Sequence, residues 1–298
     1  MSDALLPATE ATSPRFAAMD AWPSQDMLET LLEGQMAAVA AVRPALPALA
    51  VAADAAARRL ADGGRLAYVG AGTSGRIGVQ DGAELPPTFN WPRDRLALLI
   101  AGGDAALTQA IEGAEDRDDL ARTDAAVAGL GATDVVVGLA ASGATPYTLA
   151  FLQAVRTTGA LTIAIANSPG APLLAAADYA ITIETGAEPI AGSTRMKAGT
   201  AQKVALNLFS TVLMTRLGRV YQGQMVDMVA RNSKLCARAV RMLQELSGCG
   251  PSPAAVALAQ AGGAVKTAML ILRGLSCEEA EALLSRHHGR LREALAAL

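Results

Sequence analysis

Several residue types that enzymes commonly use are scarce in this chain of 298 residues. The two histidines, His287 and His288, are adjacent, so they cannot flank a zinc ion as separated ligands, and a histidine-based triad is not expected. The three cysteines, Cys236, Cys249 and Cys277, are odd in number and widely spaced, which excludes a disulfide framework and is typical of a reducing compartment. We therefore expect carboxylates, hydroxyls and backbone amides to carry any chemistry.

Aromatic and basic residues are also too sparse for nucleic-acid binding. Aromatic side chains make up 3% of the chain, which disfavours stacking platforms for single strands, and the net charge of −3 comes without a basic block. No window of about 18 residues is continuously apolar. The first residues include Glu10 and Asp20 and lack the pattern of a signal peptide. We expect a soluble, cytoplasmic protein with no nucleic-acid or membrane partner.

What the chain does contain is apolar residues, 52% against 18% charged, which excludes intrinsic disorder. Short apolar runs at residues 66–70, 96–100, 134–139, 161–165 and 179–183 alternate with segments of helical length. The runs are continuous rather than alternating, as strands buried on both faces require. The pattern predicts the α/β class, with a doubly wound parallel sheet of five strands and right-handed crossovers.

Breaks in the pattern divide the chain into three predicted regions. Residues 1–60 form an arm followed by helices, which run from about residue 24 to 61 and are interrupted by Pro44 and Pro47. Residues 61–246 hold the sheet and two long helical stretches, at 200–217 and 227–246. A Gly- and Pro-containing break at 247–251 precedes a small helical subdomain over residues 247–298.

Three loops rich in Gly, Ser and Thr fall at or near the carboxyl ends of predicted strands, at residues 70–76, 140–146 and 191–200. Glycines let the backbone approach an anion, and amides at a helix start point at it. One such loop alone is usually an ordinary strand-to-helix turn, but three favour a phosphorylated small ligand. The candidate binding residues are Gly72, Thr73, Ser74, Ser142, Gly143, Thr145, Ser193, Thr194, Arg195 and Lys197.

Two nucleotide-binding patterns do not fit these loops. Gly70, Gly72 and Gly75 have the G-x-G-x-x-G spacing, but the second predicted strand ends without the acid that a dinucleotide site needs. None of the three loops has the Walker spacing, so a P-loop nucleotide hydrolase is also excluded.

Longer motifs around the loops resemble the N-acetylmuramic acid 6-phosphate etherases, a family of phosphosugar enzymes with an SIS (sugar isomerase) domain. The matching segments are residues 68–78, 81–88, 111–116, 140–146, 192–203 and 225–235. The resemblance implies a five-stranded SIS sheet and a homodimer with its sites at the subunit interface. It also implies a lyase that needs no metal or cofactor and releases D-lactate from the sugar phosphate. One departure is Ala144, where the family usually has Arg.

The resemblance carries two acid/base residues onto Glu84 and Glu115. The segment at residues 82–87 would surround Glu84 with stiff, apolar neighbours. The residues alone favour a simpler interpretation, in which Glu84 is a carboxylate at a helix end and Glu115 belongs to a solvated acidic face. Arg195 and Lys197 could likewise pair with acids on a dimer surface rather than contact a ligand.

Two other functions stay open at this point. An SIS-type aldose–ketose isomerase also begins by removing a C2 proton, but it has no leaving ether to protonate. A phosphosugar sensor would bind without turnover. A DNA-binding sensor would carry a basic helix-turn-helix, whereas residues 1–60 hold no Lys and few Arg interspersed with acids. A sensor like the glucokinase regulatory protein would duplicate the SIS unit, and one copy is present.

Overall fold

A computed structural model describes residues 8–230 and 232–298, so the first seven residues of the predicted arm lie outside the described residues. The chain divides into two compact units. The first comprises residues 1–83 and 93–210, and the second comprises residues 84–92 and 211–298. Two helices, α3 (Gly72–Phe89) and α7 (Lys197–Arg216), begin in the first unit and end in the second.

The first unit is built on a five-stranded, all-parallel sheet in the order β2-β1-β3-β4-β5, which confirms the predicted fold class. The order reverses between β1 and β3, because β2 lies on one side of β1 and β3 on the other. The strands are β1 (Leu66–Gly70), β2 (Leu96–Ile100), β3 (Val135–Ala140), β4 (Leu161–Ala166) and β5 (Tyr179–Thr182).

Burial along the strands follows their position in the sheet. Every residue of β1, β3 and β4 is buried, as their continuous apolar runs predict. The two edge strands are less buried: β2 is half-buried over Leu96–Leu99, and in β5 only Ile181 is buried, so the expectation of burial on both faces is wrong for these two strands. An edge strand has a sheet neighbour on one side only, which leaves part of its surface uncovered.

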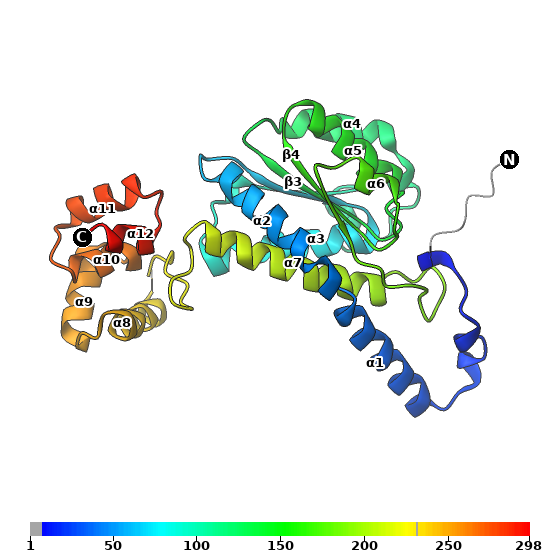
Figure 1. The fold of residues 1–298 in the computed structure, drawn as a ribbon, viewed down its shortest axis with the longest axis horizontal. Coiled ribbons are helices and arrows are strands. Elements are labelled where there is room, and N and C mark those ends of the chain that lie inside the picture. The colour runs from blue at the N-terminus through cyan, green and yellow to red at the C-terminus, as the bar shows by residue number, and fades with distance from the viewer. Residues whose placement is uncertain (1–7, 231) are drawn as a thin grey trace. The chain divides into compact units, whose positions relative to one another are not determined.

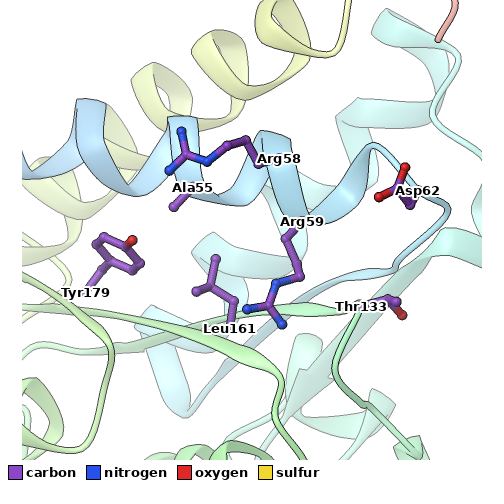
Figure 2. Close-up of a pocket in the computed structure, with 7 residues that line it drawn as sticks. All are labelled: Ala55, Arg58, Arg59, Asp62, Thr133, Leu161 and Tyr179. Carbon is purple, nitrogen blue, oxygen red and sulfur yellow. The ribbon is translucent and has the colours of Figure 1, made fainter.

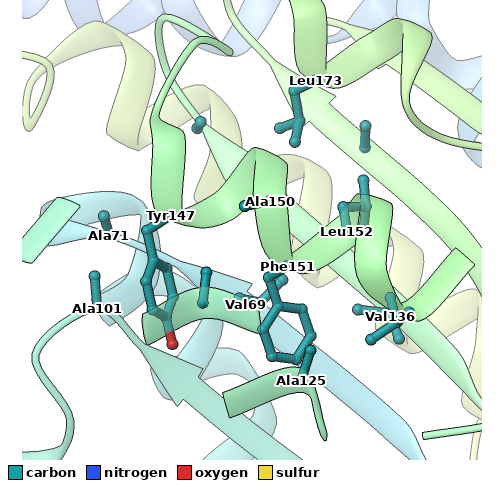
Figure 3. Packing of buried hydrophobic residues seen from close by; sticks show 14 of the residues in the cluster. Val69, Ala71, Ala101, Ala125, Val136, Tyr147, Ala150, Phe151, Leu152 and Leu173 are labelled. Carbon is teal, nitrogen blue, oxygen red and sulfur yellow. The ribbon is translucent and has the colours of Figure 1, made fainter. Parts of the chain in front are cut away.

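Helices cover both faces of the sheet (Figure 1). One face carries α4 (Asp118–Ala128), α5 (Pro146–Thr157) and the short α6 (Pro172–Ala175). The other carries α2 (Leu46–Leu60) together with the first-unit parts of α3 and α7. On the α5 face, Tyr147, Phe151 and Leu152 pack with Val69 and Val136 of the strands (Figure 3). This core fixes the strand ends from which the candidate loops emerge.

The N-terminal region consists of short 3-10 helices followed by two α-helices. The helices are η1 (Ala8–Glu10), η2 (Pro14–Phe16), η3 (Met19–Ala21), α1 (Ser24–Ala40) and α2, with η4 (Arg43–Ala45) between the last two. Pro44 and Pro47 lie at the starts of η4 and α2, which confirms that prolines interrupt this helical stretch. Proline fits there because the first turn of a helix leaves its N–H groups unpaired.

By length and composition, Ser24–Leu60 holds a helical window apolar enough to cross a membrane, with mean hydropathy 1.7, and 33% of that window is buried inside the protein. Burial of Leu49, Ala52, Ala53, Ala56 and Leu60 shows that α2 presents one side to the first unit's interior. A core helix of a soluble protein has the same composition, so this stretch is weak evidence for a membrane span.

The second unit is helical and has its own apolar core, in which Met242, Leu258, Met269 and Leu284 take part. Its helices are α8 (Ser233–Ser247), α9 (Pro251–Gln260), α10 (Val265–Ile271), α11 (Cys277–Arg286) and α12 (Leu291–Ala296). The stretch predicted as helical from residue 227 becomes helical only at Ser233, after Asn232, whose side chain accepts a hydrogen bond from the Leu235 N–H at 2.9 Å and so caps α8.

An ion-pair cluster explains why Asp227 is not helical. Its carboxylate pairs with both Arg219 and Lys266. Arg219 also donates to the carbonyls of Phe89 and Asn90, at 2.9 and 2.8 Å, and its guanidinium lies 4.9 Å from the centre of the Trp91 ring. Burial lowers the pKa of Lys266, although the charge of Asp227 opposes that shift. The cluster fixes the loop before α8 against the rest of the second unit.

The short segments between the strands complete the first unit. They are the 3-10 helices η5 (Arg93–Arg95), η6 (Asp104–Leu107) and η7 (Ala114–Asp116). Arg76 on α3 donates to the carbonyls of Ala106 and Gln109, at 2.9 and 2.8 Å, and so holds the loop that leads to η7. This loop is important because it carries Glu115.

Candidate active site

A cavity of about 540 Å³ opens where the carboxyl ends of β1 and β3 meet, at the point where the strand order reverses. Open parallel sheets bind ligands at this kind of crevice. The volume is within the usual range of small-molecule sites. The residues that line the cavity come from five segments of the first unit: Glu10, Ala71, Gly72, Thr73, Ser74, Glu115, Asp116, Ala141, Ser142, Ala144, Thr145, Pro146, Gly192 and Thr194.

The first predicted loop contributes the start of α3. Gly72, Thr73 and Ser74 line the cavity and form the first turn of the helix, whose free amides favour an anion. Gly70 and Gly75 serve packing instead, because a Cβ on Gly70 would lie 2.8 Å from the Gly75 nitrogen. The glycine spacing therefore lets β1 and α3 approach each other closely.

The second predicted loop contributes the start of α5. Ser142 and Thr145 line the cavity, with Ala144 between them and Pro146 at the first position of the helix. The Ala144 N–H donates to the Ser142 hydroxyl at 3.3 Å. Gly143 does not line the cavity but lies behind it, with φ +66°, where an added Cβ would be 2.4 Å from the Ala171 Cβ. Its role there is to let the loop turn.

The third predicted loop reaches the cavity only through Gly192 and Thr194. The amides at the start of α7 are already paired: the N–H groups of Lys197 and Ala198 each donate to the fully buried Glu188 carboxylate at 2.9 Å. The Lys197 ammonium donates to the Ala187 carbonyl at 2.9 Å. Ser193, Arg195 and Lys197 do not line the cavity, and Arg195 is exposed, so their part in ligand binding stays a prediction.

Two helix N-termini thus face one cavity, and the described residues that line it include no Lys, Arg or His. Each N-terminus carries a partial positive charge, and the hydroxyls of Thr73, Ser74, Ser142 and Thr145 add donors. Ala144 lies on this lining, where an arginine would add a full positive charge. The arrangement can hold a phosphate through amides, hydroxyls and helix dipoles.

Of the two predicted acid/base residues, Glu115 lines the cavity beside Asp116. Glu115 and Asp116 belong to η7, which follows Gly113 at φ +68°. The next residue, Arg117, pairs with Asp119 through two hydrogen bonds of 2.8 and 2.7 Å, and this hydrogen bonding lowers the pKa of Asp119 to about 2. That pairing holds the cation of Arg117 at the start of α4.

Glu84 lies further along α3, within the second unit, and its side chain is exposed to solvent. The expected apolar surroundings are partly present, because Leu85 is buried and Pro86 and Pro87 follow it on the helix. Pro86 and Pro87 line a cavity of about 210 Å³ in the second unit, together with Met225, Met228 and Leu235. Glu84 itself is not among the residues that line either cavity.

The cavity also includes two carboxylates that are not among the candidate site residues expected from the sequence, Glu10 and Asp116. Asp116 follows Glu115 directly, so the motif around Glu115 could have suggested it. Glu10 belongs to η1, far from any strand in the sequence, and neither composition nor periodicity marks it as a site residue.

A third cavity, of about 400 Å³, lies at the amino ends of the strands (Figure 2). It is lined by Arg58, Arg59 and Asp62 near the end of α2 and by Leu161 and Tyr179 at the starts of β4 and β5, with Ala55 and Thr133. Arg59 donates to the carbonyls of Ala132 and Gly159. Arg59 therefore ties α2 to the loops that precede β3 and β4.

Comparison with known families matches the sheet region to models of SIS domains. A family model described as the glucokinase regulatory protein N-terminal SIS domain matches residues 48–156, and the SIS domain model matches residues 118–212. Among solved structures, a phosphoheptose isomerase from Francisella tularensis is 19% identical with a TM-score of 0.49, covering 65% of this chain and 100% of its own.

Curated relatives match over almost the whole chain. An N-acetylmuramic acid 6-phosphate etherase from Deinococcus radiodurans is 48% identical, covering 96% of this chain and 94% of the relative. The etherase from Cronobacter sakazakii is also 48% identical, covering 96% and 97%. Identity at this level over nearly full length confirms the resemblance seen in the motifs. The chain belongs to the N-acetylmuramic acid 6-phosphate etherase family, a family of carbon–oxygen lyases.

Proposed function

We propose that this protein cleaves the D-lactyl ether of N-acetylmuramic acid 6-phosphate, giving N-acetylglucosamine 6-phosphate and D-lactate. The observation that carries the proposal is the 48% identity to curated etherases over 96% of the chain. The cavity supports it, because Glu115 shares one space with the N-termini of α3 and α5. A carboxylate and an anion-binding surface are the two parts that such a reaction needs.

The phosphate is held at the N-termini of α3 and α5. Thr73, Ser74, Ser142 and Thr145 donate hydrogen bonds from their hydroxyls, and the amides of the first helical turns add theirs. We include Gly72 and Gly143 because they allow the backbone to turn at these points, and we keep Ser193, Thr194, Arg195 and Lys197 as further contacts near the loop that precedes α7. Binding at the phosphate leaves the sugar to extend toward Glu115.

The reaction is an elimination followed by addition of water. In the open-chain sugar the C2 proton is acidic, because it lies next to the C1 aldehyde. One carboxylate removes this proton, the C3–O bond breaks as a C2–C3 double bond forms, and a carboxylic acid gives a proton to the departing lactate oxygen. Water then adds at C3 and a proton returns to C2. By the family resemblance, Glu84 and Glu115 share these acid and base roles.

The chemistry requires no redox cofactor, because each step moves only protons and electron pairs, and the family resemblance implies that no metal is used. We also propose a homodimer with its site at the subunit interface, located in the cytoplasm and without nucleic-acid or membrane partners. An exposed apolar stripe on α1 supports the dimer: Leu28, Leu32 and Met36 are 64%, 60% and 66% exposed and lie one helical turn apart.

The test is to incubate the purified protein with N-acetylmuramic acid 6-phosphate and a chelator in ¹⁸O-labelled water, and to weigh both products by mass spectrometry. We expect D-lactate that contains no ¹⁸O and a sugar phosphate that has gained ¹⁸O at C3. The sugar phosphate incubated alone corrects for exchange at C1. Lactate that contains ¹⁸O would show that the bond between the ether oxygen and the lactyl carbon is cleaved instead. A ketose product would indicate an isomerase. Tight binding without turnover would indicate a sensor.

A further inference from the structure

The N-terminal region brings a third carboxylate into the candidate cavity. Glu10 lines the cavity together with Glu115 and Asp116, although it precedes the first strand by more than fifty residues. The mechanism above uses no residue from this region. A carboxylate at this place therefore calls for a separate physical account.

A backbone hydrogen bond at Thr9 places Glu10 over the loop that precedes α7. The Gly192 N–H donates to the Thr9 carbonyl at 3.2 Å, and the Thr9 side chain is fully buried. The Glu10 Oε2 atom lies above the Gly192 backbone, where a Cβ on Gly192 would be 2.9 Å from it. Gly192, with φ +75°, thus leaves the space that the carboxylate occupies. The hydrogen bond at Thr9 therefore places the exposed Glu10 side chain at the cavity.

The Glu10 carboxylate makes no hydrogen bond or ion pair with other residues in the part of the chain that the structure describes. It therefore faces the cavity with all of its acceptor sites available. A carboxylate repels a phosphate dianion, so Glu10 does not serve the end of the ligand that the helix N-termini bind. What it can accept is a proton donor on an uncharged part of the ligand.

We propose that Glu10 is a substrate-recognition residue that accepts a hydrogen bond from the sugar part of the ligand, from a ring hydroxyl or the acetamido N–H. The inference rests on the proposed function, which makes an amino-sugar phosphate the ligand. Hydrogen bonds to an ionised acceptor are stronger than neutral ones, so one such contact is enough to select a sugar phosphate over a bare phosphate.

The test compares two ligands by calorimetry, the product N-acetylglucosamine 6-phosphate and inorganic phosphate, which lacks the sugar donors. We expect Glu10→Gln, which keeps the shape of the side chain, to weaken binding of the sugar phosphate about tenfold, equivalent to about 1.4 kcal/mol. Inorganic phosphate should bind as it does to the wild type. Asp20→Asn, an exposed acid of the same N-terminal region, is the matched control and should change neither affinity.

Gly192→Ala provides a second route to the same result, because its methyl group would displace the Glu10 carboxylate. If Glu10 acts as proposed, Gly192→Ala weakens sugar-phosphate binding, and adding it to Glu10→Ala weakens binding little further. Equal losses for sugar phosphate and inorganic phosphate, or unchanged sugar-phosphate binding in Glu10→Gln, would overturn the inference. A wild type that fails to bind the sugar phosphate would overturn it as well.

These outcomes separate the inference from the proposed function. If the wild type releases D-lactate but Glu10→Gln binds the sugar phosphate normally, the function stands and the role of Glu10 is wrong. If the wild type releases no lactate but loses sugar-phosphate affinity in Glu10→Gln, the recognition role stands and the etherase activity is wrong.

Discussion

At the scale of single residues, the buried carboxyl of Asp81 offers a test that is independent of substrate. It is 2% exposed and accepts hydrogen bonds from Tyr68 at 2.9 Å, Asn207 at 2.9 Å and Ser210 at 3.3 Å. Burial raises the pKa of Asp81, and the hydrogen bonds, with the charge of Lys203, oppose the shift only in part. The native state therefore holds this proton more tightly than the unfolded chain does.

A raised pKa makes the stability contribution of Asp81 fall as pH rises. The contribution is fully present below the pKa of the unfolded chain and is lost as pH rises through the pKa of the folded state. We predict that the free energy of unfolding of the wild type, minus that of Asp81→Asn, decreases between pH 4 and pH 7 in urea titrations. Subtracting the two free energies cancels the pH-dependent contributions of the other titrating groups, which the two proteins share. A difference that stays constant or increases with pH would contradict this account of Asp81.

At the scale of elements, the loop from β3 to α5 depends on Gly143. Its φ of +66° and the 2.4 Å approach of an added Cβ to Ala171 leave no room for a side chain. We expect Gly143→Ala to lower the free energy of unfolding by about 1–3 kcal/mol, as crowding in a packed site does. It should also weaken binding of inorganic phosphate, because the neighbouring Ser142 and Thr145 would shift.

Gly131→Ala is the matched control for that loop. Gly131 lies in the same unit, has no atom within 4 Å of an added Cβ and does not have a left-handed φ. Its substitution should change the unfolding free energy by less than about 0.5 kcal/mol. Equal losses of unfolding free energy for the two substitutions in urea titrations would mean that the turn at residue 143 does not require glycine.

The same scale shows how far the sequence predicts the structure. The strands lie within a residue of their expected bounds, and for β1, β3 and β4 the reason is that burial on both faces leaves a continuous apolar run that is easily recognised. The predicted start of α8 at residue 227 is wrong, because Asp227 forms ion pairs with Arg219 and Lys266. Lys266 is far from Asp227 along the chain. Periodicity reports local preference and cannot detect such pairs.

In the candidate site too, the sequence predicts the local features but not the contacts between distant residues. The loops at the ends of β1 and β3 line the cavity as expected, since parallel strands bring their carboxyl ends to one edge of the sheet. Glu10 was not expected there, because the contact that fixes it is a backbone hydrogen bond between Gly192 and Thr9, which leaves no pattern in the sequence. The roles of Glu84 and Glu115 come from the family resemblance, since their local sequence by itself favours a surface position.

At the scale of the whole molecule, the stripe of Leu28, Leu32 and Met36 on α1 predicts self-association. Introducing charge into the stripe with Leu32→Glu and Met36→Glu together should shift a dimer toward monomer, because burying two unpaired carboxylates is unfavourable. Light scattering across a dilution series measures the change. Lactate release should fall with the dimer if the site requires both subunits.

Val127→Glu supplies the control for that experiment. Val127 lies on α4 and is 83% exposed, so the substitution adds the same charge to an isolated surface position. It should leave the oligomeric state and the activity unchanged. A wild type that is monomeric at all concentrations, or a stripe variant that still dimerises, would contradict the proposed homodimer.

The most direct test of the proposed function is the rate of D-lactate release by Glu115→Gln. The affinity of the same variant for N-acetylglucosamine 6-phosphate is measured in parallel. The substitution keeps the size of the side chain and removes its ability to exchange a proton. We predict a loss in kcat of roughly 10²–10⁴-fold, the range for general acid–base catalysis, while the product still binds within a few-fold of its wild-type affinity. A variant that releases lactate at close to the wild-type rate would show that the carboxylate at the mouth of the sheet does not take part in the reaction.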